Sequence, residues 1–286
     1  MANQEVYEKI TSTIIASLEK GVIPWRKTWN GGVFQLPKNM VSKRLYTGIN
    51  TWVLGMQCFN SPFWGTYNQI SALGGFVRKG EKGSPIMFYS SFEKVNKETG
   101  EKEKVFVAKA WTVFNAEQCD GLNLPVAEKV ESTKNENGTI SECENIISGY
   151  VNAPSISFGG NKAFYRPSTD SVRMPELKIF ENSESYYSTF FHELTHSTGA
   201  KKRLDRLDNA TFGSHSYSKE ELVAEMGASF LCAHSGIVND SLIENSTAYI
   251  ASWLKVLKGD VKFVIQGASQ AQKAINVILG KLEDPE

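Results

Sequence analysis

The chain has 286 residues, enough for one large domain or two of ordinary size. Its 41% hydrophobic and 22% charged residues are typical of a globular protein, and no apolar run approaches the roughly 18 residues of a membrane span. The formal net charge is zero, but residues 1–125 hold 15 basic and 10 acidic residues, so they carry +5 and the remainder carries −5. This asymmetry predicts two units with different partners.

The first twenty residues predict an amphipathic helix. Val6, Ile10, Ile14 and Leu18 recur at helical spacing, and Gly21 follows as a stop. The segment has no basic start and its apolar residues are interrupted by polar ones, so it is not a signal peptide. We therefore expect a cytoplasmic protein without a membrane partner.

Two strand-like runs follow, GSPIMFYSSF at residues 83–92 and KVFVAKAWTVFN at residues 104–115. A charged connection with Gly100 near its tip joins them, which predicts a hairpin. We expect a small α+β domain at residues 1–126 and a polar linker at 127–142. A mostly helical domain at 143–286 would hold a strand, SISFGG, and helices near residues 183–197, 218–235, 241–259 and 262–282.

Basic and aromatic residues are interleaved in the first part, where residues 1–90 hold ten lysines and arginines against four acids. Proteins that bind single-stranded DNA combine a positive groove with rings on which bases stack. No helix-turn-helix, zinc-finger or basic-zipper pattern indicates a reader of duplex DNA. The candidate DNA contacts are Trp25, Arg26, Lys27, Trp29, Lys43, Arg44, Tyr46, Arg78, Lys79 and Lys82.

The alternative for each of these aromatic residues is a place in the core of a small domain. We expect Trp52 and Trp111 to lie in that core. Trp25, Trp29 and Tyr46 have polar and basic neighbours, so we expect them at the surface.

Residues 191–199 read FHELTHSTG. His192 and His196 are four apart, so on a helix both project from one face and can bind one ion, with Glu193 beside the first. Zinc lowers the pKa of a bound water toward about 7, and a neighbouring carboxylate can take its proton. This is the H-E-x-x-H pattern of metallopeptidases. A helix that carries two histidines by chance is the alternative, but the bulky YYSTFF before the motif predicts a buried helix.

A third ligand is expected downstream. Lys202 occupies the position that a third histidine would need, which leaves a glutamate on the helix predicted to begin at a Ser218 cap. Glu221 and Glu225 share a face of that helix. We predict that Glu221 binds the metal and that Glu225 accepts a hydrogen bond from the far nitrogen of a ligand histidine. The reverse assignment stays open, and Glu220 is a weaker candidate.

Two further residues precede that helix. His215 and Tyr217 are candidates for stabilising an oxyanion or binding substrate, with an ordinary loop role as the alternative. Histidine and carboxylate ligands suit Zn²⁺ best, and Mn²⁺ would also be held.

These motifs resemble a known family. HELTHSTG, the R-L-D at 203–205, YSKEELVAE at 217–225 and KAFYRPSTDSVRMP at 162–175 are similar to the zincin-like metallopeptidase domain of ArdC antirestriction proteins and of polyvalent proteins of plasmids and phages. PWRKTW, the Y-x-G-I-N-x-W-x-L at 46–54 and the segment from YNQI to VRKGEKG at 67–83 resemble the ArdC N-terminal domain. The resemblance implies a gluzincin-type fold, single-stranded DNA binding and protection of incoming conjugative DNA from host restriction.

Three functions compete at this point. The first is an antirestriction protein that binds single-stranded DNA and has a metal-dependent peptidase-like site, with a protein substrate or a restriction-system component as a further partner. The second is a cytoplasmic zinc metallopeptidase whose N-terminal domain recognises a protein substrate. The third is a DNA-binding module in which the zincin domain is only structural. The basic, aromatic N-terminal part favours a DNA partner.

Overall fold

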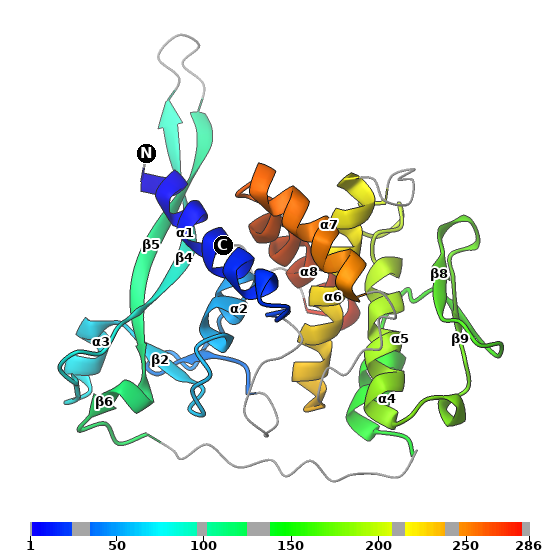
Figure 1. Cartoon of the computed structure of the whole chain (residues 1–286), viewed down its shortest axis with the longest axis horizontal. Helices are drawn as coiled ribbons and strands as arrows, with labels where there is room; N and C mark the ends of the chain where they lie inside the picture. Colours follow the sequence, from blue (N-terminus) through cyan, green and yellow to red (C-terminus); the bar gives the residue numbers. More distant parts are fainter. Residues whose placement is uncertain are drawn as a thin grey trace.

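The computed structural model describes residues 2–24, 35–95, 102–124, 138–207, 215–237 and 246–281. The fold is α+β, with a long hairpin beside a group of packed helices and a small separate sheet at the far side of those helices (Figure 1). In the described part of the chain, no helix is long and apolar enough to cross a membrane.

The described residues of the first part form three helices and six strands. The helices are α1 (Ala2–Glu19), α2 (Ile49–Gly55) and α3 (Tyr67–Ala72). The strands are β1 (Lys38–Asn39), β2 (Phe63–Gly65), β3 (Phe76–Val77), β4 (Ser84–Val95), β5 (Lys102–Asn115) and β6 (Cys119–Asp120). They form a four-stranded sheet in the order β1-β2-β5-β4 and a β3-β6 pair. A short 3-10 turn, Ala116–Gln118, precedes β6.

Strand β4 is the edge of the larger sheet, and α2 closes that edge with a side chain. The Asn50 amide nitrogen lies 2.7 Å from the Met87 carbonyl oxygen, and the Met87 amide donates to Asn50 Oδ1 over 2.8 Å. Both groups are buried, so this amide satisfies two backbone atoms that an edge strand would otherwise leave without partners.

Five helices and three strands make up the second part as far as the structure describes it. The helices are α4 (Ser141–Gly149), α5 (Ser183–Ser197), α6 (His215–Ser235), α7 (Ser246–Gly259) and α8 (Phe263–Ile278). The strands β7 (Ser155–Phe158), β8 (Phe164–Arg166) and β9 (Ser171–Met174) form a sheet in the order β7-β9-β8. Two 3-10 turns, Pro167–Thr169 and Leu177–Ile179, flank β9.

One hydrophobic core joins the two parts. It includes the buried face of α1 and side chains of α2 together with side chains of α5 to α8. The rings of Trp52 on α2 and Phe230 on α6 are 4.6 Å apart between centroids. A hydrogen bond from the Gly48 amide to Gln272 Oε1 (3.1 Å) crosses the same boundary.

The structure settles several expectations about the elements. The helix predicted at 183–197 is confirmed as α5. The prediction that Ser218 caps the next helix is wrong, because α6 begins at His215 and Ser218 lies inside its first turns. Helix α4 begins at Ser141, within the linker expected at 127–142, and residues 125–137 lie outside the described part of the chain. The division at these residues stays a prediction.

The expectations for two aromatic side chains are also wrong. Tyr46 is buried, 6% exposed, because its ring packs with side chains of α2, β2, β4 and β5 and its hydroxyl accepts a hydrogen bond from Asn39 Nδ2. Trp111 is 52% exposed, because the hairpin extends beyond the side chains that cover its inner end. Trp52 is 1% exposed, so its predicted place in the core is confirmed.

Candidate metal centre

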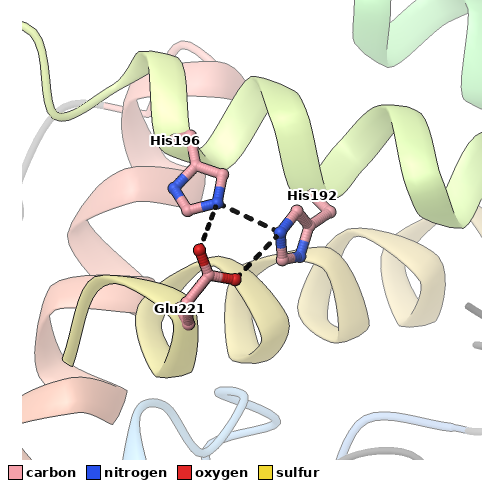
Figure 2. Close-up of side chains that lie close together, drawn as sticks. All are labelled: His192, His196 and Glu221. Atoms are coloured by element: carbon pink, nitrogen blue, oxygen red, sulfur yellow. Dashed lines mark hydrogen bonds and ion pairs between the residues drawn. The ribbon is translucent and has the colours of Figure 1, made fainter. Parts of the chain in front are cut away.

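Helix α5 presents the two histidines. Asn182 caps it, accepting the Ser185 amide over 2.7 Å, and its apolar face is buried by tyrosine and phenylalanine side chains. His192 and His196 lie one turn apart on the face that meets α6, each with 14% of its side chain exposed. Figure 2 shows both rings directed toward Glu221 of α6.

The two helices approach each other closely beside the site. A Cβ atom on Gly227 of α6 would lie 2.5 Å from Cγ2 and 2.7 Å from Oγ1 of Thr195 on α5. Thr195 is fully buried and its hydroxyl donates to the Phe191 carbonyl oxygen over 2.7 Å. Gly227 therefore sets the helix spacing that brings Glu221 to the histidines.

His192, His196 and Glu221 form a triangle of ligand atoms. Nε2 of the two histidines are 3.0 Å apart, and the Glu221 oxygens lie 3.6 Å from His192 Nε2 and 3.7 Å from His196 Nε2. Four ligands at 2.0–2.1 Å around tetrahedral zinc are separated by about 3.4 Å. The three side chains therefore fit one divalent cation with little rearrangement.

Each histidine presents Nε2 to this point because its other ring nitrogen faces a carboxylate. His192 Nδ1 lies 3.4 Å from Glu225 Oε1, and His196 Nδ1 lies 3.0 Å from Glu220 Oε1. A carboxylate at Nδ1 holds the proton there, so Nε2 keeps the lone pair that a metal needs. Glu225 has the position that the sequence predicts for it, whereas Glu220 has a larger role than the sequence suggested.

Arg206 fixes Glu220 in turn. Its Nε and Nη2 lie 2.7 Å and 2.9 Å from the two Glu220 oxygens, and it also donates to Thr195 O on α5 and to Thr198 Oγ1 directly after that helix. Only 9% of the Arg206 side chain and 13% of the Glu220 side chain are exposed. The Arg206–Glu220 pair is thus largely shielded from solvent and holds the Glu220 carboxylate against Nδ1 of His196.

The acidic surroundings change the protonation of the site. Burial alone would lower the pKa of His192, but the hydrogen bond to Glu225 and the nearby carboxylates outweigh it and raise the pKa to about 9. Burial also lowers the pKa of His196, but the hydrogen bond to Glu220 and the charge of Glu221 outweigh it, so the pKa is again raised. Burial raises the pKa of Glu220, but His196 and Arg206 lower it by more. The net pKa is below its ordinary value, so this carboxyl stays ionised. The site favours cations, and a metal must displace protons to enter.

The other predicted residues of this site lie on the same two helices. Glu193 follows His192 on α5 and is 9% exposed. Tyr217 is half-buried near the start of α6. His215 is the first residue of that helix, and its side chain lies outside the described part of the structure.

A second ionic cluster holds the loop after α5. Arg203 and Lys202 both reach the Asp170 carboxylate, with shortest separations of 2.6 Å and 2.7 Å, and the Tyr165 hydroxyl donates to it over 2.8 Å. The lysine at position 202 thus anchors the small sheet to the loop that carries Arg206. Because Asp170 belongs to the segment KAFYRPSTDSVRMP, the structure shows a structural role for that motif.

The candidate DNA contacts differ in exposure and in ion pairing. Lys43, Arg44, Lys79 and Lys82 are exposed. Arg78 is paired with Glu81 and Asp120, at 3.2 Å each, which reduces the positive charge it offers to a phosphate. Tyr46 is buried, and Trp25, Arg26, Lys27 and Trp29 lie outside the described residues.

The sequence missed Arg206 and undervalued Glu220. Adjacent glutamates on a helix point about 100° apart, so the pair 220–221 could have indicated two acids around one site. Arg206 follows His196 by ten residues within a loop, and no periodic pattern indicates that it returns to the site.

Comparisons with known proteins find two family matches along the chain. Residues 143–270 match the zincin-like metallopeptidase family, and residues 4–114 match the N-terminal domain of anti-restriction factor ArdC. An uncharacterized protein, y4eC, of Sinorhizobium fredii is 33% identical over 94% of this chain and 90% of its own length. Two Escherichia coli proteins called DNA primase TraC are each 36% identical over 96% of this chain, which spans only 27% and 20% of their lengths.

Solved structures agree along nearly the whole chain. The crystal structure of the antirestriction protein ArdC from plasmid R388 in its metal-free form has a TM-score of 0.81 and 35% identity, covering 96% of this chain and 97% of that one. Its Mn(II)-bound form has a TM-score of 0.80 and 34% identity, covering 98% and 99%. The zincin-like match and the manganese-bound relative indicate a divalent-metal site, which agrees with the ligand triangle. The chain belongs to the ArdC antirestriction family.

Proposed function

We propose that this protein binds single-stranded DNA through its N-terminal part and holds a divalent metal at His192, His196 and Glu221 for a peptidase-like reaction. In this proposal it protects incoming conjugative DNA from restriction in the recipient's cytoplasm. The observation that carries it is the convergence of three metal ligands from α5 and α6 within a chain that resembles ArdC over nearly its full length. A DNA partner follows from the family and from the +5 charge of residues 1–125.

The metal chemistry would follow from the residues around the triangle. A divalent cation there would act as a Lewis acid toward water and toward a peptide carbonyl. Glu193 directly follows His192 on α5, and we assign its carboxylate the role of accepting a proton during attack. Glu225 and Glu220 hold the two imidazoles in orientation, and Tyr217 is the candidate for stabilising an oxyanion.

DNA binding is tested with a labelled oligonucleotide and the full-length chain. We expect measurable affinity at low salt and a linear fall of log affinity with log salt, at about 0.7 per phosphate contact for a single strand. A duplex competitor of the same sequence should compete poorly. Absence of binding at 20 mM salt would refute the DNA part of the proposal and would favour a metallopeptidase whose N-terminal part recognises a protein.

The metal part is tested with a matched pair of neighbouring variants. His192→Ala removes a proposed ligand, whereas Glu193→Gln leaves all three ligands in place. We expect His192→Ala to lose the metal that elemental analysis finds in the wild type, and Glu193→Gln to keep it while losing any peptide cleavage. Both should bind the oligonucleotide normally. Equal metal content in His192→Ala would remove this site, and the same elemental analysis identifies zinc or manganese.

The third competing function is tested with Glu193→Gln in conjugation. If peptidase chemistry contributes to protection, this variant should protect transferred DNA less well than the wild type from a restricting recipient. Full protection by a variant that retains metal and fold would show that the zincin part is structural for this function.

A further inference from the structure

The β4–β5 hairpin has one face on which burial changes abruptly. Register places Ser84 opposite Val113, Ile86 opposite Trp111 and Phe88 opposite Lys109, and residues paired in this way point to the same side. At the inner end of this face Ile86 and Val113 are 1% and 0% exposed. The next residue outward on the same face of each strand is exposed: Phe88, after Ile86 on β4, is 47% exposed, and Trp111, beside Val113 on β5, is 52% exposed.

The inner end of this face is covered, whereas Phe88 and Trp111 are only partly covered. Tyr46, Leu54 and Trp64 pack with Ile86 and Val113 into a separate small core. Phe88 lies at the rim of that core, where its ring centroid is 6.4 Å from that of the buried Tyr46. The Tyr46 hydroxyl is held by Asn39, so Phe88 rests against a ring that is fixed in place.

Trp111 and Phe88 are diagonal neighbours across the two strands. Such neighbours lie about 7–8 Å apart, within mutual reach for aromatic side chains. Both side chains are half exposed on one sheet face, so the burial that stabilises such large aromatic residues is incomplete. Flat rings on a strand surface are the kind of support on which unstacked bases lie.

The charge beside the rings fits the same ligand. Lys109 is exposed directly opposite Phe88. The described residues of this face from 84 to 88 and 109 to 113 include no carboxylate. A cation next to two rings offers one phosphate contact and two stacking surfaces.

A second exposed phenylalanine, Phe76, can be compared with Phe88. Phe76 on β3 is also a strand residue with an exposed ring, at 56%. Its cross-strand neighbour is Asp120, and Glu81 lies in the same ionic cluster around Arg78. An exposed phenylalanine opposite an acid is poorly suited to DNA, whereas one opposite a lysine is well suited.

We propose that Trp111 and Phe88 form a stacking platform for two bases of single-stranded DNA and that Lys109 contacts the adjoining phosphate. The proposal deepens the proposed DNA-binding function and rests on it. Because stacking accepts any base, the platform would bind without strict sequence preference. Tyr46 supports the platform from beneath rather than contacting DNA.

The test measures binding of a fluorescein-labelled oligothymidine to the full-length chain by anisotropy at low salt. Loss of a stacking ring costs about 5- to 150-fold in affinity, so Phe88→Ala and Trp111→Ala should each weaken binding within that range. Trp111→Phe should restore most of the loss, because a flat ring is retained. Phe76→Ala is the matched control and should bind as the wild type does.

Salt dependence separates the rings from the lysine. Phe88→Ala and Trp111→Ala should leave the salt slope unchanged, because neither removes a phosphate contact. Lys109→Gln should reduce the slope by about 0.7. Circular dichroism melting and metal content report whether each variant keeps its fold.

The outcomes distinguish this platform from the wider function. If the wild type does not bind the oligonucleotide, the proposed function fails and the platform fails with it. If the wild type binds and the folded Phe88→Ala and Trp111→Ala variants bind equally well, only the platform is overturned. An equal loss in Phe76→Ala would also overturn it, since the effect would then not depend on this face.

Discussion

Replacement of Gly227 by alanine tests whether the α5–α6 contact sets the metal site. The added Cβ would lie 2.5 Å from Thr195 Cγ2, whereas ordinary contacts between carbon atoms begin near 3.5 Å. Thr195 cannot turn aside easily, because it is buried and its hydroxyl is bonded to Phe191 O. The helices must therefore separate by about 1 Å at this point.

That separation has two measurable costs. Overpacking in a core costs about 1–3 kcal/mol, and the better helix propensity of alanine returns about 1 kcal/mol, so we expect a net loss of about 0–2 kcal/mol in the free energy of unfolding. Metal ligands tolerate only about 0.2 Å of error. Because Glu221 is carried by α6, a 1 Å shift should weaken metal binding by at least about 10- to 100-fold, the loss seen when less direct supports of a site are removed.

A second substitution makes this reasoning refutable. Thr195→Ala removes both atoms of the close contact and leaves the new Cβ 3.1 Å from the Cβ at position 195, a gap that a few tenths of an ångström relieve. The double variant should regain metal affinity that Gly227→Ala loses, measured by competition with a chromophoric chelator, and urea unfolding should show favourable coupling. Wild-type metal affinity in Gly227→Ala, or no recovery in the double variant, would show that this contact does not position Glu221.

Three further results are expected. Glu220→Ala should weaken metal binding about 10- to 100-fold while sparing oligonucleotide affinity, because it releases His196 Nδ1 and leaves all three ligands. Burial raises the pKa of Asp170, but Lys202, Tyr165 and Arg203 outweigh it and lower the pKa below its ordinary value. This group therefore stabilises the fold above its unfolded pKa, and the contribution is lost as pH falls through the lower folded pKa. Urea unfolding of Asp170→Asn should show a free energy of unfolding about 1.5–3 kcal/mol below that of the wild type at pH 7, and this difference should shrink at pH 3. Asn50→Ala should lower the free energy of unfolding by about 1–3 kcal/mol, because it leaves the backbone N–H and C=O of Met87 buried without partners.

The elements around the metal site could be predicted because their signals are local. A capping asparagine, buried aromatic residues at helical spacing and two histidines four apart all specify α5 within fifteen residues. The positions of Glu221 and Glu225 follow from the same periodicity on α6. What the sequence could not show is the Arg206–Glu220 clamp, because it depends on a loop that folds back after α5.

The burial of the aromatic residues was harder to predict. Tyr46 lies between exposed residues, and only the return of its segment against β4 and α2 places it inside. Trp111 has the alternating pattern of a core strand, but burial depends on what covers the sheet, and the cover ends at Ile86 and Val113. Local pattern specifies which face a side chain points to, whereas its exposure depends on distant parts of the chain.

The shared core changes how the two family matches should be understood. One match ends at residue 114 and the other begins at residue 143, yet Ile10, Ile14 and Trp52 of the first part are at most 1% exposed in a core formed with α6, α7 and α8. Separating the parts would expose these side chains, at about 1.5–3 kcal/mol for each, a large fraction of the stability of a domain. The two parts therefore fold as one unit, in which Trp52 contacts the helix that carries Glu221. In the proposed function, the DNA-binding surface of the first part and the metal site of the second are therefore held in a fixed relation by this shared core.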